Sequence, residues 1–237
     1  MNGNDTLEAR YRAVKERIGR AAAAAGRDAA SVRLLAVGKT FPPEDLRALA
    51  GLGQREFGEN YVQEAEAKIA ALAGMDLVWH YIGPIQSNKT RRIAETFDWV
   101  QSVQDERIAR RLSAQRPPDR PPLNVCLQVN LSGEATKSGC SPDEVLPLAL
   151  TVNALPGLAL RGLMAIPEPT ADSGLQARRF GELRALFDQA KERLSAGSGF
   201  DTLSMGMSAD LEAAIAQGAT LVRVGSALFG ERPRAAG

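Results

Sequence analysis

The order of apolar and amphipathic segments predicts a single (β/α)8 barrel with one extra helix at its N-terminus. Short apolar segments alternate with amphipathic ones eight times within the 237 residues. Strands that are apolar throughout and separated by helices pair in parallel. Eight such units in about 200 residues suit a barrel near the lower size limit of that fold. A doubly wound open sheet is the alternative, but no G-x-G-x-x-G follows the first strand.

The composition is that of a soluble globular protein without an obvious charged partner. Hydrophobic residues make up 44% and charged residues 24%, and the formal net charge is +1. We therefore expect no nucleic-acid partner, and no apolar stretch is long enough to span a membrane. The N-terminus lacks the features of a signal peptide, which predicts a cytoplasmic protein. No break in composition divides residues 1–237, and no exposed apolar stripe predicts an oligomer, so we expect one domain and a monomer.

The extra helix spans about residues 5–25, and the barrel spans about residues 32–230. Apolar residues recur in the helix at intervals of three or four, and Gly26 ends it. The eight strands are predicted at 33–39, 54–58, 77–82, 99–103, 123–130, 158–166, 202–205 and 221–224. Helices are predicted at 43–52, 60–73, 105–115, 173–194, 209–217 and 226–229. One further helix is predicted to begin near residue 87, and another to end near residue 155. Arg116–Pro122, with four prolines, is expected to be a stiff connection.

Lys39 ends the first apolar strand, which Pro42 and Pro43 prevent from continuing. Functional residues of such barrels lie at the carboxyl ends of the strands. A lysine partly buried there has its charged form disfavoured, as an imine-forming amine requires. The alternative is a lysine whose stem covers apolar surface while its charge stays in water.

The ends of the seventh and eighth strands predict an anion site. Gly206 allows a close backbone approach, and Ser208 is expected at the N-cap of the following helix. Gly225 and Ser226 open another short helix. Helix N-termini present free N–H groups to anions, and these two loops form the recurrent phosphate position of the fold. Together with a lysine at a strand end, they indicate a phosphate-bearing aldehyde, pyridoxal phosphate.

Five segments, in this order, carry a resemblance to the pyridoxal phosphate homeostasis protein family. They are Ala-Val-Gly-Lys-Thr at 36–40, Phe-Gly-Glu-Asn-Tyr-Val-Gln-Glu at 57–64, His-Tyr-Ile-Gly-Pro-Ile-Gln-Ser-Asn-Lys at 80–89, Leu-Ser-Met-Gly-Met-Ser at 203–208 and Arg-Val-Gly-Ser-Ala-Leu-Phe-Gly at 223–230. The family's fold is similar to the N-terminal barrel domain of alanine racemases. The chain departs from the common family pattern at Gly38, Tyr81 and Ser226.

The resemblance implies a role for each site residue. Lys39 would form the Schiff base with pyridoxal phosphate. Ser208, Gly225 and Ser226 would hold the phosphate through hydroxyl and backbone N–H groups. The implied function is binding, buffering or delivery of the cofactor, with apo enzymes that use it as possible recipients.

The resemblance also places Arg223 at the pyridine nitrogen and Asn60 near the phenolic oxygen of the ring. A guanidinium is always protonated and only donates hydrogen bonds, so it would keep that nitrogen unprotonated and the ring a weak electron sink. Similar racemases add an acid–base residue from a C-terminal domain, which the sequence ending at Gly237 does not include. We therefore expect a non-catalytic carrier without catalytic residues. The alternatives are an amino-acid racemase or decarboxylase, and a barrel without cofactor that binds nucleic acid or protein.

Other reactive residue types are few. The single histidine, His80, excludes a multi-histidine metal centre, and it is expected to be structural rather than a proton shuttle. Cys126 and Cys140 are expected to be reduced, with Cys126 in the core and Cys140 unreactive. Lys137, in a polar loop, is either a second amine for cofactor capture or an ordinary surface lysine.

Overall fold

Eight parallel strands close into a barrel in chain order. The computed structural model describes residues 6–132, 138–194 and 197–230. The strands are β1 (Arg33–Val37), β2 (Glu56–Glu59), β3 (Val78–Tyr81), β4 (Trp99–Val103), β5 (Leu123–Gln128), β6 (Leu158–Met164), β7 (Thr202–Ser204) and β8 (Leu221–Val224). Leu35 of β1 lies opposite Arg223 of β8, and this pairing closes the barrel. The predicted fold is confirmed and the open sheet is excluded.

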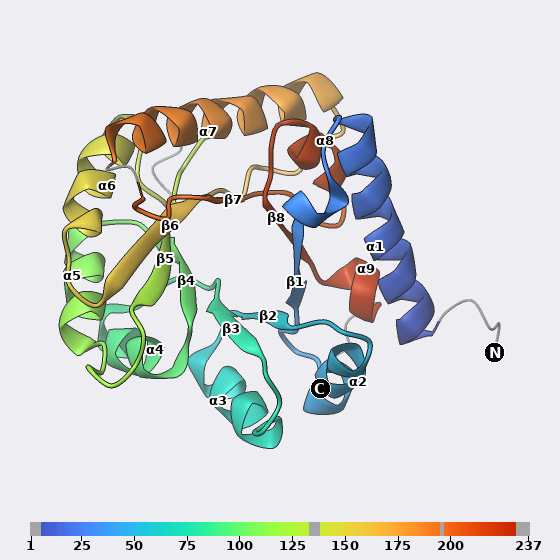
Figure 1. The fold of residues 1–237 in the computed structure, drawn as a ribbon, viewed down its shortest axis with the longest axis horizontal. Helices are drawn as coiled ribbons and strands as arrows, with labels where there is room; N and C mark the ends of the chain where they lie inside the picture. Colours follow the sequence, from blue (N-terminus) through green and yellow to red (C-terminus); the bar gives the residue numbers. More distant parts are fainter. Residues whose placement is uncertain (1–5, 133–137, 195–196, 231–237) are drawn as a thin grey trace.

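Helices surround the strands (Figure 1). They are α1 (Leu7–Ala24), α2 (Pro43–Gly51), α3 (Val62–Ala71), α4 (Thr90–Thr96), α5 (Glu106–Gln115), α6 (Val145–Asn153), α7 (Ser173–Arg193), α8 (Leu211–Ala216) and α9 (Ser226–Phe229). Short 3-10 turns occupy Ala29–Ser31, Ser87–Lys89 and Pro142–Glu144. Among the described residues, no helix combines the length and apolar character that crossing a bilayer requires.

The extra helix α1 begins at Leu7, and the Thr6 hydroxyl caps it by accepting a hydrogen bond from the Ala9 N–H at 3.2 Å. Its apolar stripe buries Val14, Ile18 and Ala22. The helix lies beside α8 and α9, outside the strands that close the barrel (Figure 1). The sequence period therefore predicts the buried face of α1 correctly.

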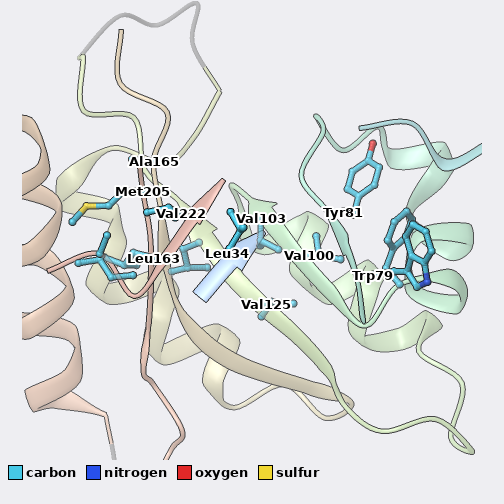
Figure 2. Packing of buried hydrophobic residues seen from close by; sticks show 14 of the residues in the cluster. Leu34, Trp79, Tyr81, Val100, Val103, Val125, Leu163, Ala165, Met205 and Val222 are labelled. Carbon is cyan, nitrogen blue, oxygen red and sulfur yellow. The ribbon is translucent and has the colours of Figure 1, made fainter. Parts of the chain in front are cut away.

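The main hydrophobic core lies between the strands and the surrounding helices. Leu163 of β6, Val222 of β8 and Met205, directly after β7, belong to this core and lie near one another in Figure 2. Gly162 is required in this layer, because a Cβ there would lie only 1.6 Å from the Thr202 carbonyl oxygen.

The interior of the barrel is partly polar. Trp99 of β4 lies within 5.1 Å of the guanidinium groups of Arg33 and Arg161, measured to the ring centroid. These arginines come from β1 and β6, which are not neighbours of β4, so all three side chains lie inside the barrel. Cys126 and Met164 pack with Trp99 there. The strand pattern alone predicts apolar strands, but it does not say which polar residues face inward.

Candidate functional site

Lys39 lies in a tight turn directly after β1. The Gly38 N–H donates to the Gly58 carbonyl at 3.0 Å, and the Phe41 N–H donates to the Gly38 carbonyl at 3.0 Å. Thr40 has φ 70°, the only positive value among the described residues other than glycine. The Lys39 side chain is half-buried. The strand therefore ends two residues earlier than predicted, and Lys39 belongs to a strained turn at the carboxyl end of the barrel.

Ser208 and Ser226, predicted at separate loops, come together. The Ser226 hydroxyl donates to the Ser208 hydroxyl at 3.3 Å, and the Ala227 N–H lies 3.4 Å from the same oxygen. Gly225 lies against the end of β1, where an added Cβ would be 3.3 Å from the Val37 carbonyl oxygen. The loops after β7 and β8 thus place two hydroxyls and a helix N-terminus close to the strand that leads to Lys39.

The prediction that Ser208 caps the next helix is wrong. Residues 208–210 form a turn, and α8 starts only at Leu211, with Asp210 at its N-cap. The reason is local, because the Asp210 carboxylate accepts the Met207 N–H at 2.6 Å and thereby closes that turn first. The Ser208 hydroxyl instead contacts the start of α9, through Ser226 and the Ala227 N–H. Gly206 does allow a close approach, and the neighbour is α8, since its Cβ would lie 2.5 Å from that of Ala214.

Arg223 is buried inside the barrel, with 4% of its surface exposed. One terminal nitrogen donates to the Ser204 hydroxyl at 2.7 Å, and the other donates to the Ala165 carbonyl at 2.8 Å. Burial lowers the pKa of Arg223 to about 10, so the guanidinium remains protonated at neutral pH. Each bond uses one N–H of its nitrogen, which leaves the group able to donate to a further acceptor.

A chain of hydrogen bonds continues from Arg223 across the barrel. The Ser204 hydroxyl donates to Gln101 Oε1 at 2.6 Å, and Gln101 Nε2 lies 2.9 Å from His80 Nδ1. His80 Nε2 lies 3.1 Å from the Glu56 carboxylate. Burial lowers the pKa of His80, against the opposing influence of the nearby Glu56 carboxylate, which favours the neutral imidazole. The donors of Arg223 and Ser204 both point away from the guanidinium, toward Gln101.

Asn60 follows β2, as predicted, and its side-chain Oδ1 is buried without a hydrogen-bond partner among the described residues. Its backbone lies tightly against the next strand end, because a Cβ on Gly83 would be 2.2 Å from the Asn60 carbonyl oxygen. An unpaired buried amide oxygen costs free energy, so this amide is a candidate for ligand contact.

Sequence reasoning missed a buried ion cluster behind the Lys39 turn. Lys68 of α3 donates to Glu59 at 2.8 Å and to Glu64 at 2.6 Å, with only 5% of its side chain exposed. Burial raises the pKa of Glu59 to about 7, although Lys68 opposes that rise. A signal was present, because Lys68 falls on the same helical face as Val62 and Ala65, where an apolar residue is expected.

The remaining candidate residues are the two cysteines, His80 and Lys137. Cys126 and Cys140 are both buried, and burial raises the pKa values of their thiols to about 12 and about 11, so neither is a reactive thiolate. His80 lies within the hydrogen-bond chain described above. Lys137 lies outside the described residues.

The fold and much of the sequence are shared with proteins of a known family. A family model for the alanine racemase N-terminal domain matches residues 5–233. A pyridoxal phosphate homeostasis protein of Pseudomonas aeruginosa is 60% identical over 219 residues, which cover 92% of this chain and 93% of that protein. One from Escherichia coli K12 is 47% identical over 92% of this chain and 94% of its own.

The chain belongs to the pyridoxal phosphate homeostasis protein family. A solved structure of PipY from Synechococcus elongatus with PLP bound is 34% identical, covers 95% of this chain and 100% of its own, and superposes with a TM-score of 0.83. Alanine racemase from Corynebacterium glutamicum shares the barrel alone, with 16% identity and a TM-score of 0.69 over 94% of this chain and 62% of its own. Membership of the homeostasis protein family therefore agrees with the resemblance carried by the five segments.

Proposed function

We propose that this protein binds pyridoxal phosphate at Lys39 and takes part in homeostasis of the cofactor, by binding, buffering or delivering it. The observation that carries the proposal is the placement of three groups on the adjacent strands β7, β8 and β1 and the loops that follow them. These are the turn of Lys39, the Ser208–Ser226 hydroxyl pair beside the start of α9, and the buried guanidinium of Arg223. The names of the relatives and the PLP-bound PipY structure support it.

The residues present fit the chemical groups of this cofactor. Its aldehyde needs an amine, which Lys39 supplies. Its phosphate needs hydrogen-bond donors, which the hydroxyls of Ser208 and Ser226 and the backbone around Gly225 supply. Its ring nitrogen needs a donor, which Arg223 supplies.

The Asn60 amide suits the phenolic oxygen of the ring, because its Oδ1 is left unpaired by the described residues. Oxygen and nitrogen of an amide exchange places by a simple flip, so the same side chain can present its NH₂ group to that oxygen.

The same contacts argue for binding rather than turnover. When bound, the cofactor supplies an electron-withdrawing ring, and this ring withdraws electrons strongly only when its nitrogen is protonated. Arg223 cannot accept the hydrogen bond of a protonated ring nitrogen, because it stays charged and only donates through its N–H groups. The Ser204 hydroxyl, which donates to Gln101, and the Ala165 carbonyl hold this guanidinium in place.

The test is covalent trapping in parallel with a turnover assay. Borohydride reduction followed by mass spectrometry is expected to find the cofactor on the peptide containing Lys39, and Lys39→Ala is expected to remove both the adduct and the visible absorbance. Ser208→Ala is expected to weaken cofactor affinity while leaving the adduct possible. An adduct on another residue would refute the assignment of Lys39. Rapid racemisation or decarboxylation of an amino acid by the purified protein would favour the enzyme alternative.

The proposal extends to the setting of the protein. We propose a single-domain monomer in the cytoplasm, with apo enzymes that require the cofactor as recipients. Transfer to such an apo enzyme faster than the cofactor's release into solution would support delivery. Transfer no faster than that release would favour buffering.

A further inference from the structure

We propose that Lys68, a residue remote from the cofactor groups named above, is a positioning residue for Lys39. The inference rests on the proposed function, in that Lys39 is taken to hold the cofactor. Lys68 acts on the backbone of the Lys39 turn from the outer side of the barrel, through a buried cluster with Glu59 and Glu64.

The Lys68 ammonium is fully used by three acceptors. Nζ donates to the Gly38 carbonyl at 2.7 Å, to Glu59 Oε1 at 2.8 Å and to Glu64 Oε1 at 2.6 Å. An ammonium has three donors, so each one has a partner although the side chain is almost completely buried. A lysine that only covered apolar surface would keep its charge in water, and this one does not.

Two of the contacts of this cluster reach the two peptide groups on either side of Lys39. The Gly38 carbonyl belongs to the peptide group that precedes Lys39, and Lys68 binds it directly. The Thr40 N–H belongs to the peptide group that follows Lys39, and it donates to Glu64 Oε1 at 2.5 Å. The cluster therefore holds the backbone of Lys39 at both ends of the residue.

This turn needs such support because its backbone is strained. Thr40 is β-branched and has φ 70°, a strained conformation that persists only when surrounding contacts impose it. Relaxation of Thr40 would rotate the peptide group next to Lys39. The hydrogen bond from Thr40 to Glu64, whose carboxylate Lys68 holds, opposes that rotation.

Glu59 completes the cluster and explains the glycine before Lys39. A Cβ on Gly38 would lie 2.9 Å from Glu59 Oε1 and 3.1 Å from the methyl groups of Leu46 on α2. The outer face of Gly38 is thus filled by the cluster and by α2.

The experiment compares two ligands that differ only in their need for the Lys39 amine. Pyridoxal phosphate requires the amine, whereas pyridoxine 5′-phosphate carries an alcohol in place of the aldehyde and uses only the phosphate and ring contacts. The variants are Lys68→Met and, in case an unpaired Glu59 prevents folding, the double variant Lys68→Met with Glu59→Gln. Lys191→Met, which removes an exposed lysine of α7, is the control.

The expected result is a loss of about tenfold or more in affinity for pyridoxal phosphate in both Lys68 variants, from loss of charge-assisted bonds to the turn. Affinity for the alcohol analogue should change by less than about twofold, and the control should match the wild type for both ligands. Equal losses for both ligands would mean a general structural role and would overturn the inference, as would unchanged affinity for pyridoxal phosphate. Wild-type protein that binds neither ligand would refute the proposed function itself, and the inference with it.

Discussion

The charge state of Glu59 should make the stability of this protein depend on pH around neutrality. Burial raises the pKa of Glu59 from 4.5 to about 7, despite the ion pair with Lys68. The folded state therefore holds the carboxyl proton more tightly than the unfolded state does. Its stabilising contribution is fully present below about pH 4.5 and is lost as the pH rises through about 7.

At about 1.4 kcal/mol for each pKa unit, the rise of the Glu59 pKa from 4.5 to about 7 corresponds to about 3 kcal/mol, most of which falls between about pH 5 and about pH 8. Glu59→Gln keeps an acceptor for Lys68 but has no proton to lose. The free energy of unfolding of the variant, relative to the wild type, should therefore rise by about 2–3 kcal/mol between those two pH values.

Denaturant unfolding followed by circular dichroism at both pH values measures this difference. Glu64→Gln is the matched control, because it removes a carboxylate from the same lysine at a place where 27% of the side chain is exposed. That control should keep most of the pH dependence of the wild type. If the stability of Glu59→Gln and of the wild type changes in parallel with pH, the argument from the burial of Glu59 fails.

Three further predictions concern packing in the barrel and in α1 and the burial of the thiols. Gly162→Ala should prevent β6 and β7 from pairing, because its Cβ would lie 1.6 Å from the Thr202 carbonyl oxygen, and little folded protein is expected by circular dichroism. Gly19→Ala on α1, where nothing lies within 4 Å of the new Cβ, should fold normally and give a melting temperature at least equal to that of the wild type. Cys126 and Cys140 should remain unlabelled by a thiol reagent in the native state and react on unfolding, because burial raises the pKa values of both thiols; rapid native labelling would contradict this.

The sequence by itself determined the order of the elements, the fold class and most of the candidate site. Hydrophobic period and the placement of glycine and proline are local properties, and they place Lys39, Asn60 and Arg223 at or near strand ends without any knowledge of the fold. Because parallel strands of a barrel end on the same side, the sequence also predicts that these residues share one end.

Only the tertiary structure decided which groups touch. Ser204 and Gln101 are 103 residues apart and meet through the centre of the barrel, a contact that depends on closure and register. The Ser208 hydroxyl contacts the start of α9 and does not cap α8, because Asp210 closes the turn before α8 starts. Lys68 becomes a support for the Lys39 turn only because α3 packs against the end of β2. Apart from the local turn closed by Asp210, these contacts join residues distant in the chain, and local periodicity carries no information about them.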